Sequence, residues 1–141
     1  MGVEHNLPVR VYYEDTDFTG VVYHASYLRF LERGRTDALR LMGVMHSALL
    51  AQPDPAAFAV TRLAIDFVAA ARIDDALLVR TSFEAVSGPR LFINQSIVRG
   101  DDLIARAKVE AACVALGGRA RRPPAALRNL IRPYLAGGDA S

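Results

Sequence analysis

The sequence predicts a mixed α+β fold, in which a five-stranded antiparallel sheet wraps around one long helix. Residues 26–42 carry the 3.6-residue period of an amphipathic helix, whereas apolar residues elsewhere recur with the period of two expected of strands. Turn-forming residues separate the later strand-like stretches at hairpin-like intervals. One helix cannot cover both faces of such a sheet, so we expect the sheet to curl around the helix and bury its apolar stripe.

The first predicted strand covers residues 7–13. Val9, Val11 and Tyr13 alternate with Arg10 on the opposite side, which is the pattern of a half-buried strand. Residues 15–20 are rich in turn formers, so a loop is expected between this strand and the helix.

The long helix is predicted over residues 26–42. On a helical wheel with about 100° per residue, apolar and small residues share one face and charged residues occupy the other. Ser26 or His24 is expected near the N-cap, and Gly43 is expected to end the helix. The predicted buried face contains Tyr27, Leu28, Leu31, Gly34, Ala38, Leu39 and Met42.

Four strands are predicted after a polar, proline-containing loop at residues 52–55. The first two cover residues 59–69 and 77–83, and the last two follow from the alternation within residues 91–97 and 105–113. Turns are expected at residues 87–89 and 100–102. The C-terminal residues 118–141 are basic, and we expect either a solvated tail or a short helix opening at Pro123 and Pro124.

The composition indicates an ordinary globular protein, and we expect one domain over residues 1–141. Hydrophobic residues make up 52% of the chain and charged residues 23%, which argues against disorder. The formal net charge of +2 is too small to indicate nucleic-acid binding. The single cysteine, Cys113, excludes an internal disulfide and fits a reducing compartment. Because the sequence contains neither an apolar signal core nor a stretch of about 20 apolar residues, we expect a soluble cytoplasmic protein without a transmembrane segment.

The residues with the clearest chemical role lie between the first strand and the helix. Glu14, Asp15, Asp17 and His24 fall within eleven positions, around the flexible Gly20. A carboxylate before a helix N-terminus is stabilised by the helix dipole, and the free N–H groups of the first turn can hold a developing oxyanion. A base and an electrophile activator side by side are the minimum equipment for hydrolysing a carbonyl compound. Two nearby carboxylates alone are a weak metal signal, so no metal site is predicted.

The same segment resembles a known family. Residues 13–27, YEDTDFTGVVYHASY, and residues 30–35, FLERGR, are similar to the Tol-Pal-associated acyl-CoA thioesterases, within the 4-hydroxybenzoyl-CoA thioesterase group of hotdog proteins. The resemblance extends from about Val9 to the end of the last strand. Residues 71–75 also resemble the start of the family's third strand, and residues 87–92 a hairpin near its coenzyme A site.

This resemblance implies a hotdog thioesterase that cleaves acyl-CoA without a metal or other cofactor. It also implies a homotetramer, a dimer of dimers with active sites at the dimer interface. Asp17 matches the family's catalytic carboxylate, which either activates water or attacks the thioester directly. The backbone N–H of His24 matches the group that polarises the thioester carbonyl. We place Tyr23, Thr61 and Arg90 among the substrate-binding residues, with Arg90 where the family has basic residues against the coenzyme A phosphates.

Several side chains keep more than one interpretation. The imidazole of His24 suits substrate binding, proton transfer or a hydrogen bond to a neighbour. Glu32 is the alternative catalyst, because some hotdog enzymes use a helix glutamate. Asp15 is expected to hold the turn through side-chain to backbone hydrogen bonds. Arg35 lies within the apolar stripe, where a buried guanidinium needs a partner, and Asp15 or Asp66 is expected to supply it.

Acyl-CoA hydrolysis is therefore the predicted function, with two alternatives. A hotdog dehydratase would need a catalytic histidine with an acidic partner, and the position of Asp17 before the helix favours hydrolysis over dehydration. A non-catalytic hotdog protein would bind acyl groups or dock to an acyl carrier protein without turnover.

Overall fold

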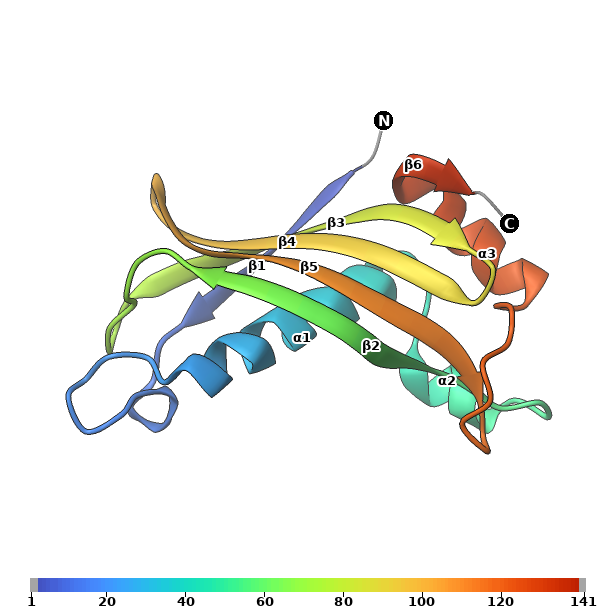
Figure 1. Cartoon of the computed structure of the whole chain (residues 1–141), viewed down its shortest axis with the longest axis horizontal. Coiled ribbons are helices and arrows are strands. Elements are labelled where there is room, and N and C mark those ends of the chain that lie inside the picture. Colours follow the sequence, from blue (N-terminus) through green and yellow to red (C-terminus); the bar gives the residue numbers. More distant parts are fainter. Residues whose placement is uncertain (1–2, 140–141) are drawn as a thin grey trace.

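The computed structural model describes residues 3–139, in which a curved sheet encloses one long helix (Figure 1). The main sheet is antiparallel and has the strand order β1-β3-β4-β5-β2. Helix α1 (His24–Leu41) lies along its concave face. The predicted hotdog arrangement of five antiparallel strands around one helix is confirmed. The strands are β1 (Glu4–Arg10), β2 (Ala56–Phe67), β3 (Ala76–Ser87), β4 (Arg90–Arg99) and β5 (Asp102–Ala115).

The first strand ends earlier than predicted, and a short helix was missed. β1 ends at Arg10, and Tyr13 belongs to a 3-10 turn (Tyr13–Asp15) with its side chain 75% exposed. The alternation holds only for Val9 and Val11, which are buried. Helix α2 (His46–Ala51) lies in the connection between α1 and β2.

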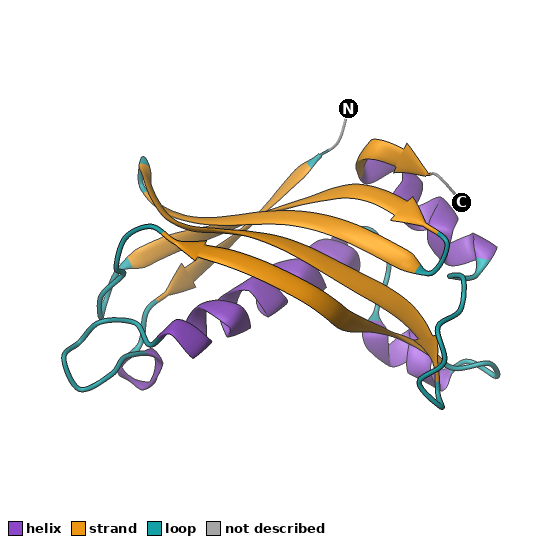
Figure 2. Ribbon diagram, viewed as in Figure 1, coloured by secondary structure: helices purple, strands orange, loops and turns teal. Residues whose placement is uncertain are grey.

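The C-terminal residues form a helix and a strand rather than a solvated tail. Helix α3 (Ala125–Ile131) begins directly after Pro124, as one alternative predicted, and a 3-10 turn (Arg132–Tyr134) follows it. Strand β6 (Leu135–Asp139) then pairs in parallel with β3, at the end of the sheet shown in Figure 2 beside α3. Leu127, Ile131 and Leu135 are buried in the core, which explains why this segment is ordered. Residues 140–141 lie outside the described residues.

Helix α1 buries a wider face than the helical wheel indicated. It begins at His24, two residues before the predicted start, and Gly43 follows its end with a left-handed φ of 95°. Six of the seven residues predicted on the apolar face are buried, whereas Leu28 is 40% exposed. Phe30 is fully buried although it was not assigned to that face. The sheet curls around the helix and therefore covers more than one stripe.

Helix and sheet approach each other closely at Gly34. A Cβ atom there would lie 2.6 Å from Cγ1 of Val79 and 3.0 Å from Oγ1 of Thr81. Beside this contact, the buried side-chain amide of Gln95 donates to the carbonyl of Leu31 and to Oγ1 of Thr81, both at 2.9 Å. These bonds satisfy a buried polar group and fasten the middle of α1 to β3 and β4.

The prediction that Arg35 pairs with a carboxylate is wrong. Its guanidinium donates to Oε1 of Gln95 at 3.1 Å. Asp15 is occupied in the loop before α1, and Asp66 accepts from Arg106 at 3.1 Å on the surface. Arg35 is only half-buried, so water still hydrates part of the guanidinium and a neutral partner is enough.

Replacing Gly34 by alanine is expected to lower the free energy of unfolding by up to about 2 kcal/mol, because overpacking a core costs about 1–3 kcal/mol and alanine regains about 1 kcal/mol of helix propensity. The added methyl would meet the stiff, β-branched and fully buried Val79. Urea denaturation measures the change. Gly117→Ala is the matched control, because a Cβ there has no neighbour within 4 Å. Equal stabilities of the two variants would contradict the close approach.

Candidate active site

A cavity of about 400 Å³ opens at the N-terminus of α1. Its lining is mainly apolar and comes from residues 21–22, from His24 and Tyr27 in the first turn of α1, and from residues 67–70. Tyr27 is buried, and its hydroxyl accepts a hydrogen bond from the N–H of Ala71 at 3.0 Å. A rigid, mainly apolar cavity with few polar groups suits an apolar ligand held in one orientation.

The first turn of α1 presents unpaired main-chain donors at this cavity. Tyr23 is the N-cap residue and makes no side-chain capping bond. Within residues 3–139, the N–H groups of His24 and Ala25 have no hydrogen-bond acceptor, whereas the N–H of Ser26 donates to the carbonyl of Tyr23 at 2.8 Å. Free N–H groups at the positive end of a helix favour a negatively charged oxygen.

The loop that bears Asp17 closes on itself next to the cavity. The N–H of Asp17 donates to the carbonyl of Val21 at 2.9 Å, and the N–H of Gly20 donates back to the carbonyl of Asp17 at 3.2 Å. Gly20 has a left-handed φ of 82°, which glycine adopts without strain. The backbone of Asp17 is thus paired with Val21, which lines the cavity.

The carboxylate of Asp17 is held in its ionised form. Its Oδ1 accepts hydrogen bonds from the hydroxyl of Thr19 at 2.6 Å and from the N–H of Thr19 at 2.8 Å. These donors, the hydroxyl first, keep the pKa of Asp17 below its ordinary value of 3.8. Asp17 is half-exposed and does not itself line the cavity, so in a single chain the carboxylate lies on the adjoining loop.

Aromatic rings form one side of the cavity around His24. The imidazole stacks on Tyr23 with 4.9 Å between ring centroids and meets the edge of Phe67 at 6.0 Å. Among the described residues the imidazole makes no hydrogen bond to a neighbour, so that interpretation of His24 is not supported. Phe67 was missed in the sequence. An aromatic residue followed by the small apolar residues 68–71 is the signal that could have found it.

Arg90 lies at the other end of the sheet in a single chain. It faces residue 112 of β5, whereas Phe67 at the cavity faces residue 105. Seven residues of strand correspond to about 23 Å. The side chain of Arg90 is 61% exposed and approaches the carboxylate of Glu110 at 3.8 Å.

Thr61 and Glu32 also lie outside the cavity. Thr61 is in the middle of β2, where the pairing with β5 shifts, and its hydroxyl donates to the carbonyl of Glu110 at 3.1 Å. Glu32 is eight residues after His24, about 12 Å along the helix. It accepts from the hydroxyl of Thr36 and lines a second cavity of about 240 Å³. The structure therefore brings His24 to the cavity, with Tyr23 stacked on its imidazole and Asp17 on the adjoining loop. Thr61, Arg90 and Glu32 lie elsewhere.

An antiparallel sheet curled around one helix defines a hotdog protein, and an apolar cavity with free main-chain donors where the helix begins suits hydrolysis of a carbonyl compound. The family model of the thioesterase-like superfamily matches residues 11–130, and the chain belongs to this family. The protein is a thioester hydrolase.

Named relatives and solved structures agree with this assignment. Acyl-CoA thioesterase YbgC of Haemophilus influenzae is 46% identical over 112 residues, covering 79% of this chain and 82% of that protein. A probable thioesterase from Bartonella henselae has a TM-score of 0.84 and 40% identity, covering 86% of this chain and 100% of that one. A 1,4-dihydroxy-2-naphthoyl-CoA thioesterase from Synechocystis has a TM-score of 0.83 and 26% identity, covering 92% of this chain and 96% of that one.

Across residues 3–139, no helix has both the length and the apolar character needed to span a membrane.

Replacing Thr19 by valine is expected to raise the pKa of Asp17, because the hydroxyl that stabilises the charged carboxylate is removed. Titration of the Asp17 carboxyl carbon by nuclear magnetic resonance measures this pKa directly. Thr19→Ser keeps the hydroxyl and is the matched control, with a pKa close to that of the wild type. Identical titration curves for the valine and serine variants would show that the hydroxyl does not hold the carboxylate.

Proposed function

We propose that this thioester hydrolase cleaves acyl-CoA into a free acid and coenzyme A, with Asp17 as the catalytic carboxylate and the N–H of His24 as the donor that polarises the thioester. One observation carries the proposal: unpaired N–H groups begin α1 beside an apolar cavity and a loop that bears an ionised carboxylate. The relatives named acyl-CoA thioesterase YbgC support the substrate class.

In the proposed mechanism the acyl group lies in the cavity and its carbonyl oxygen accepts hydrogen bonds from the first N–H groups of α1. These donors stabilise the negative charge that develops on the oxygen. Asp17 removes a proton from water as the water oxygen adds to the carbonyl carbon, or its carboxylate adds directly and water hydrolyses the resulting anhydride. In both routes the C–S bond breaks, and the coenzyme A thiolate leaves and is protonated.

The complete site requires a second copy of the chain. β2 is an edge strand, and Val60 and Phe67 on it are 48% and 51% exposed. Such an open apolar edge favours pairing with another strand. When two β2 strands pair antiparallel about a two-fold axis, the start of one lies beside the end of the other. The end of the sheet that carries Arg90 in one protomer then adjoins the His24 cavity of its partner.

The remaining candidate residues take their roles from this assembly. The exposed guanidinium of Arg90 has only a loose contact with Glu110, so it is available for a coenzyme A phosphate. Tyr23 is 52% exposed beside His24, where its ring contacts the acyl chain. Thr61 lies in the middle of β2, near the proposed two-fold axis, and contributes a hydroxyl to the substrate-binding space between the two protomers.

Finer assignments belong to the same proposal. Residues 13–27 support membership of the Tol-Pal-associated branch of the 4-hydroxybenzoyl-CoA thioesterase group. The exposed β2 edge supports a homo-oligomer, which we assign as a dimer of dimers. The single, buried Cys113 is consistent with a reducing cytoplasm. Acyl groups carried on an acyl carrier protein are the alternative thioester donors.

Replacing Asp17 by asparagine is expected to lower kcat by about 10²–10⁴-fold, because the base or nucleophile is lost. The assay follows free coenzyme A with a thiol reagent over a panel of acyl-CoA chain lengths, and circular dichroism checks the fold. Asp101→Asn, in the exposed β4–β5 turn, is the matched control and keeps wild-type turnover. Normal activity of the Asp17 variant on every substrate would overturn the catalytic assignment. A wild-type protein that binds acyl-CoA without releasing thiol would instead support a dehydratase or a non-catalytic binding protein.

Replacing Val60 by aspartate is expected to dissociate the oligomer and abolish activity. The two-fold axis places the new carboxylates of both strands near one another at the apolar edge, where like charges repel. Light scattering coupled to size-exclusion chromatography measures the mass of the assembly. Ala125→Asp, at the exposed start of α3, is the control. A Val60 variant that keeps the mass of the wild-type assembly would refute pairing through β2.

A further inference from the structure

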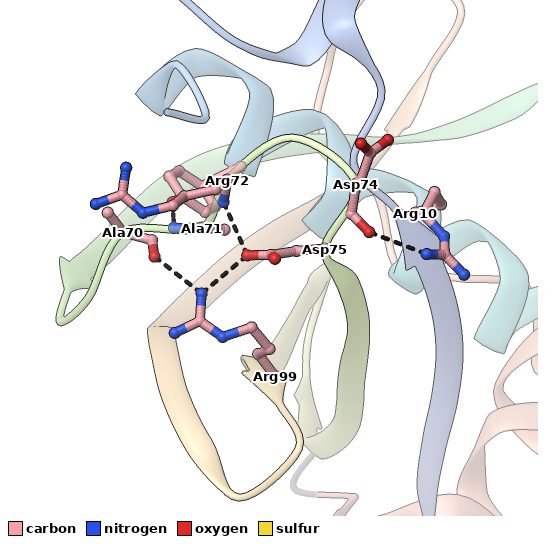
Figure 3. Close-up of polar contacts among 8 residues, drawn as sticks. Arg10, Ala70, Ala71, Arg72, Asp74, Asp75 and Arg99 are labelled. Carbon is pink, nitrogen blue, oxygen red and sulfur yellow. Dashed lines mark hydrogen bonds and ion pairs between the residues drawn. The ribbon is translucent and has the colours of Figure 1, made fainter. Parts of the chain in front are cut away.

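One ion pair clamps the loop that joins β2 to β3, residues 68–75, here called the 68–75 loop. Arg99, at the end of β4, donates from Nη1 to Oδ2 of Asp75 at 2.8 Å and to the carbonyl of Ala70 at 3.2 Å (Figure 3). The same Asp75 oxygen accepts from the N–H of Arg72 at 2.9 Å. Nη1 of Arg99 and Oδ2 of Asp75 thus connect the middle of the loop with its last residue and with β4.

The 68–75 loop in turn holds the segment between Asp17 and the first turn of α1. The N–H of Val22 donates to the carbonyl of Ala71 at 2.9 Å, and the N–H of Ile73 donates to the carbonyl of Gly20 at 3.0 Å. The N–H of Ala71 reaches the hydroxyl of Tyr27 on α1. The position of this loop therefore sets the position of the residues that lead into the helix.

Little apolar packing holds the loop itself. Only Ala71 is buried among residues 68–75, although residues 68–70 form one wall of the His24 cavity. Main-chain bonds fix the two ends, and Asp74 adopts a left-handed φ of 71° that is uncommon for a residue with a side chain. Arg10 donates to the carbonyl of Asp74 at 2.9 Å, as Figure 3 also shows. Ala71 and Ile73 bond to the segment before α1 and to Tyr27, and the contact from Arg99 is what links the middle of the loop to β4.

The pair is shielded and ionised. The Arg99 and Asp75 side chains are 35% and 24% exposed, compared with 64% and 69% for Arg106 and Asp66. Burial opposes the charge on Asp75, but the N–H of Arg72 and the Arg99 guanidinium outweigh it and lower the pKa of Asp75. The hydrogen bond with Asp75 raises the pKa of Arg99. A shielded pair is screened less by salt than an exposed one.

We propose that Asp75 and Arg99 are positioning residues for thioester hydrolysis. Their ion pair holds the 68–75 loop, and through it the Gly20–Val22 backbone that sets the first N–H groups of α1 and the Asp17 carboxylate relative to each other. The inference rests on the proposed roles of Asp17 and His24. Neither Asp75 nor Arg99 lines the cavity, so they act through the loop and not on the substrate.

This role has a distinct kinetic consequence. A displacement of about 1 Å at reacting groups costs about 10²-fold in rate. Loss of the clamp is therefore expected to lower kcat by roughly 10- to 100-fold. KM for acyl-CoA is expected to change by a smaller factor, because the coenzyme A contact proposed at Arg90 lies away from the loop. A purely structural role would lower the melting temperature and leave kcat per folded molecule unchanged.

The experiment compares Arg99→Met, Asp75→Asn and the double variant of the full-length chain. Steady-state kinetics on acyl-CoA is combined with circular dichroism, which gives the folded fraction. If the two residues act as one clamp, the double variant loses no more kcat than the worse single variant. Arg99→Lys, which restores a cation and hydrogen-bond donors, is expected to recover most of the turnover. Arg80→Met is the matched control, because it removes the exposed Arg80–Glu4 pair away from the loop.

Wild-type kcat in folded Arg99→Met, or losses that add in the double variant, would overturn the clamp. If Arg99→Met does not fold, the isosteric Asp75→Asn variant tests the clamp instead. A kcat equal to that of the wild type in this variant would overturn the proposal. Hydrogen exchange of the backbone amides in the clamp variants gives a second readout. The N–H groups of Val22 and Ile73 are expected to lose protection from exchange, whereas those between β4 and β5 keep it. A normal Asp17→Asn enzyme would defeat the proposed function itself, whereas an inactive Asp17→Asn enzyme beside a fully active Arg99→Met enzyme defeats this inference alone.

Discussion

The packing of α1 into the concave face of the sheet is the constraint on which the site depends. Gly34 lets the helix backbone approach the strands, and Gln95 binds the carbonyl of Leu31 in the middle of the helix. A densely packed interior transmits displacements rather than absorbing them. The N–H group of His24, about two turns before Leu31, is therefore placed by contacts that lie outside the cavity.

The chemistry lies on loops, but main-chain hydrogen bonds make those loops rigid. The N–H of Asp17 bonds to Val21, and the N–H of Val22 bonds to Ala71 in the 68–75 loop. Arg99 then ties the 68–75 loop to β4. The cavity itself ends at β2, an edge strand with exposed apolar side chains. In the proposed assembly, pairing of two β2 strands covers this edge and also brings the Arg90 end of one protomer to the His24 cavity of its partner. This gives a physical reason for an interface at β2.

Periodicity predicted the elements that bury one face and failed where burial depends on single residues. Six residues of the α1 face and the alternation of the later strands were correct, because a repeating pattern needs only local spacing. The C-terminal segment buries Leu127, Ile131 and Leu135 among basic residues, so its composition concealed a packed element. The partner of Arg35 is an amide 60 positions away on β4, and no spacing rule relates the two.

The sequence by itself determined the single long helix, the glycine turns and the cluster of Asp17 and His24 around the start of that helix. These are local properties, since side-chain period, backbone freedom and the order of residues are written along the chain. Only the tertiary structure decided that residues 67–70 line the same cavity as residues 21–22, His24 and Tyr27. It also decided that Arg90 lies at the far end of the sheet from this cavity. Contacts between distant segments depend on strand order and register, which arise from packing of the whole chain.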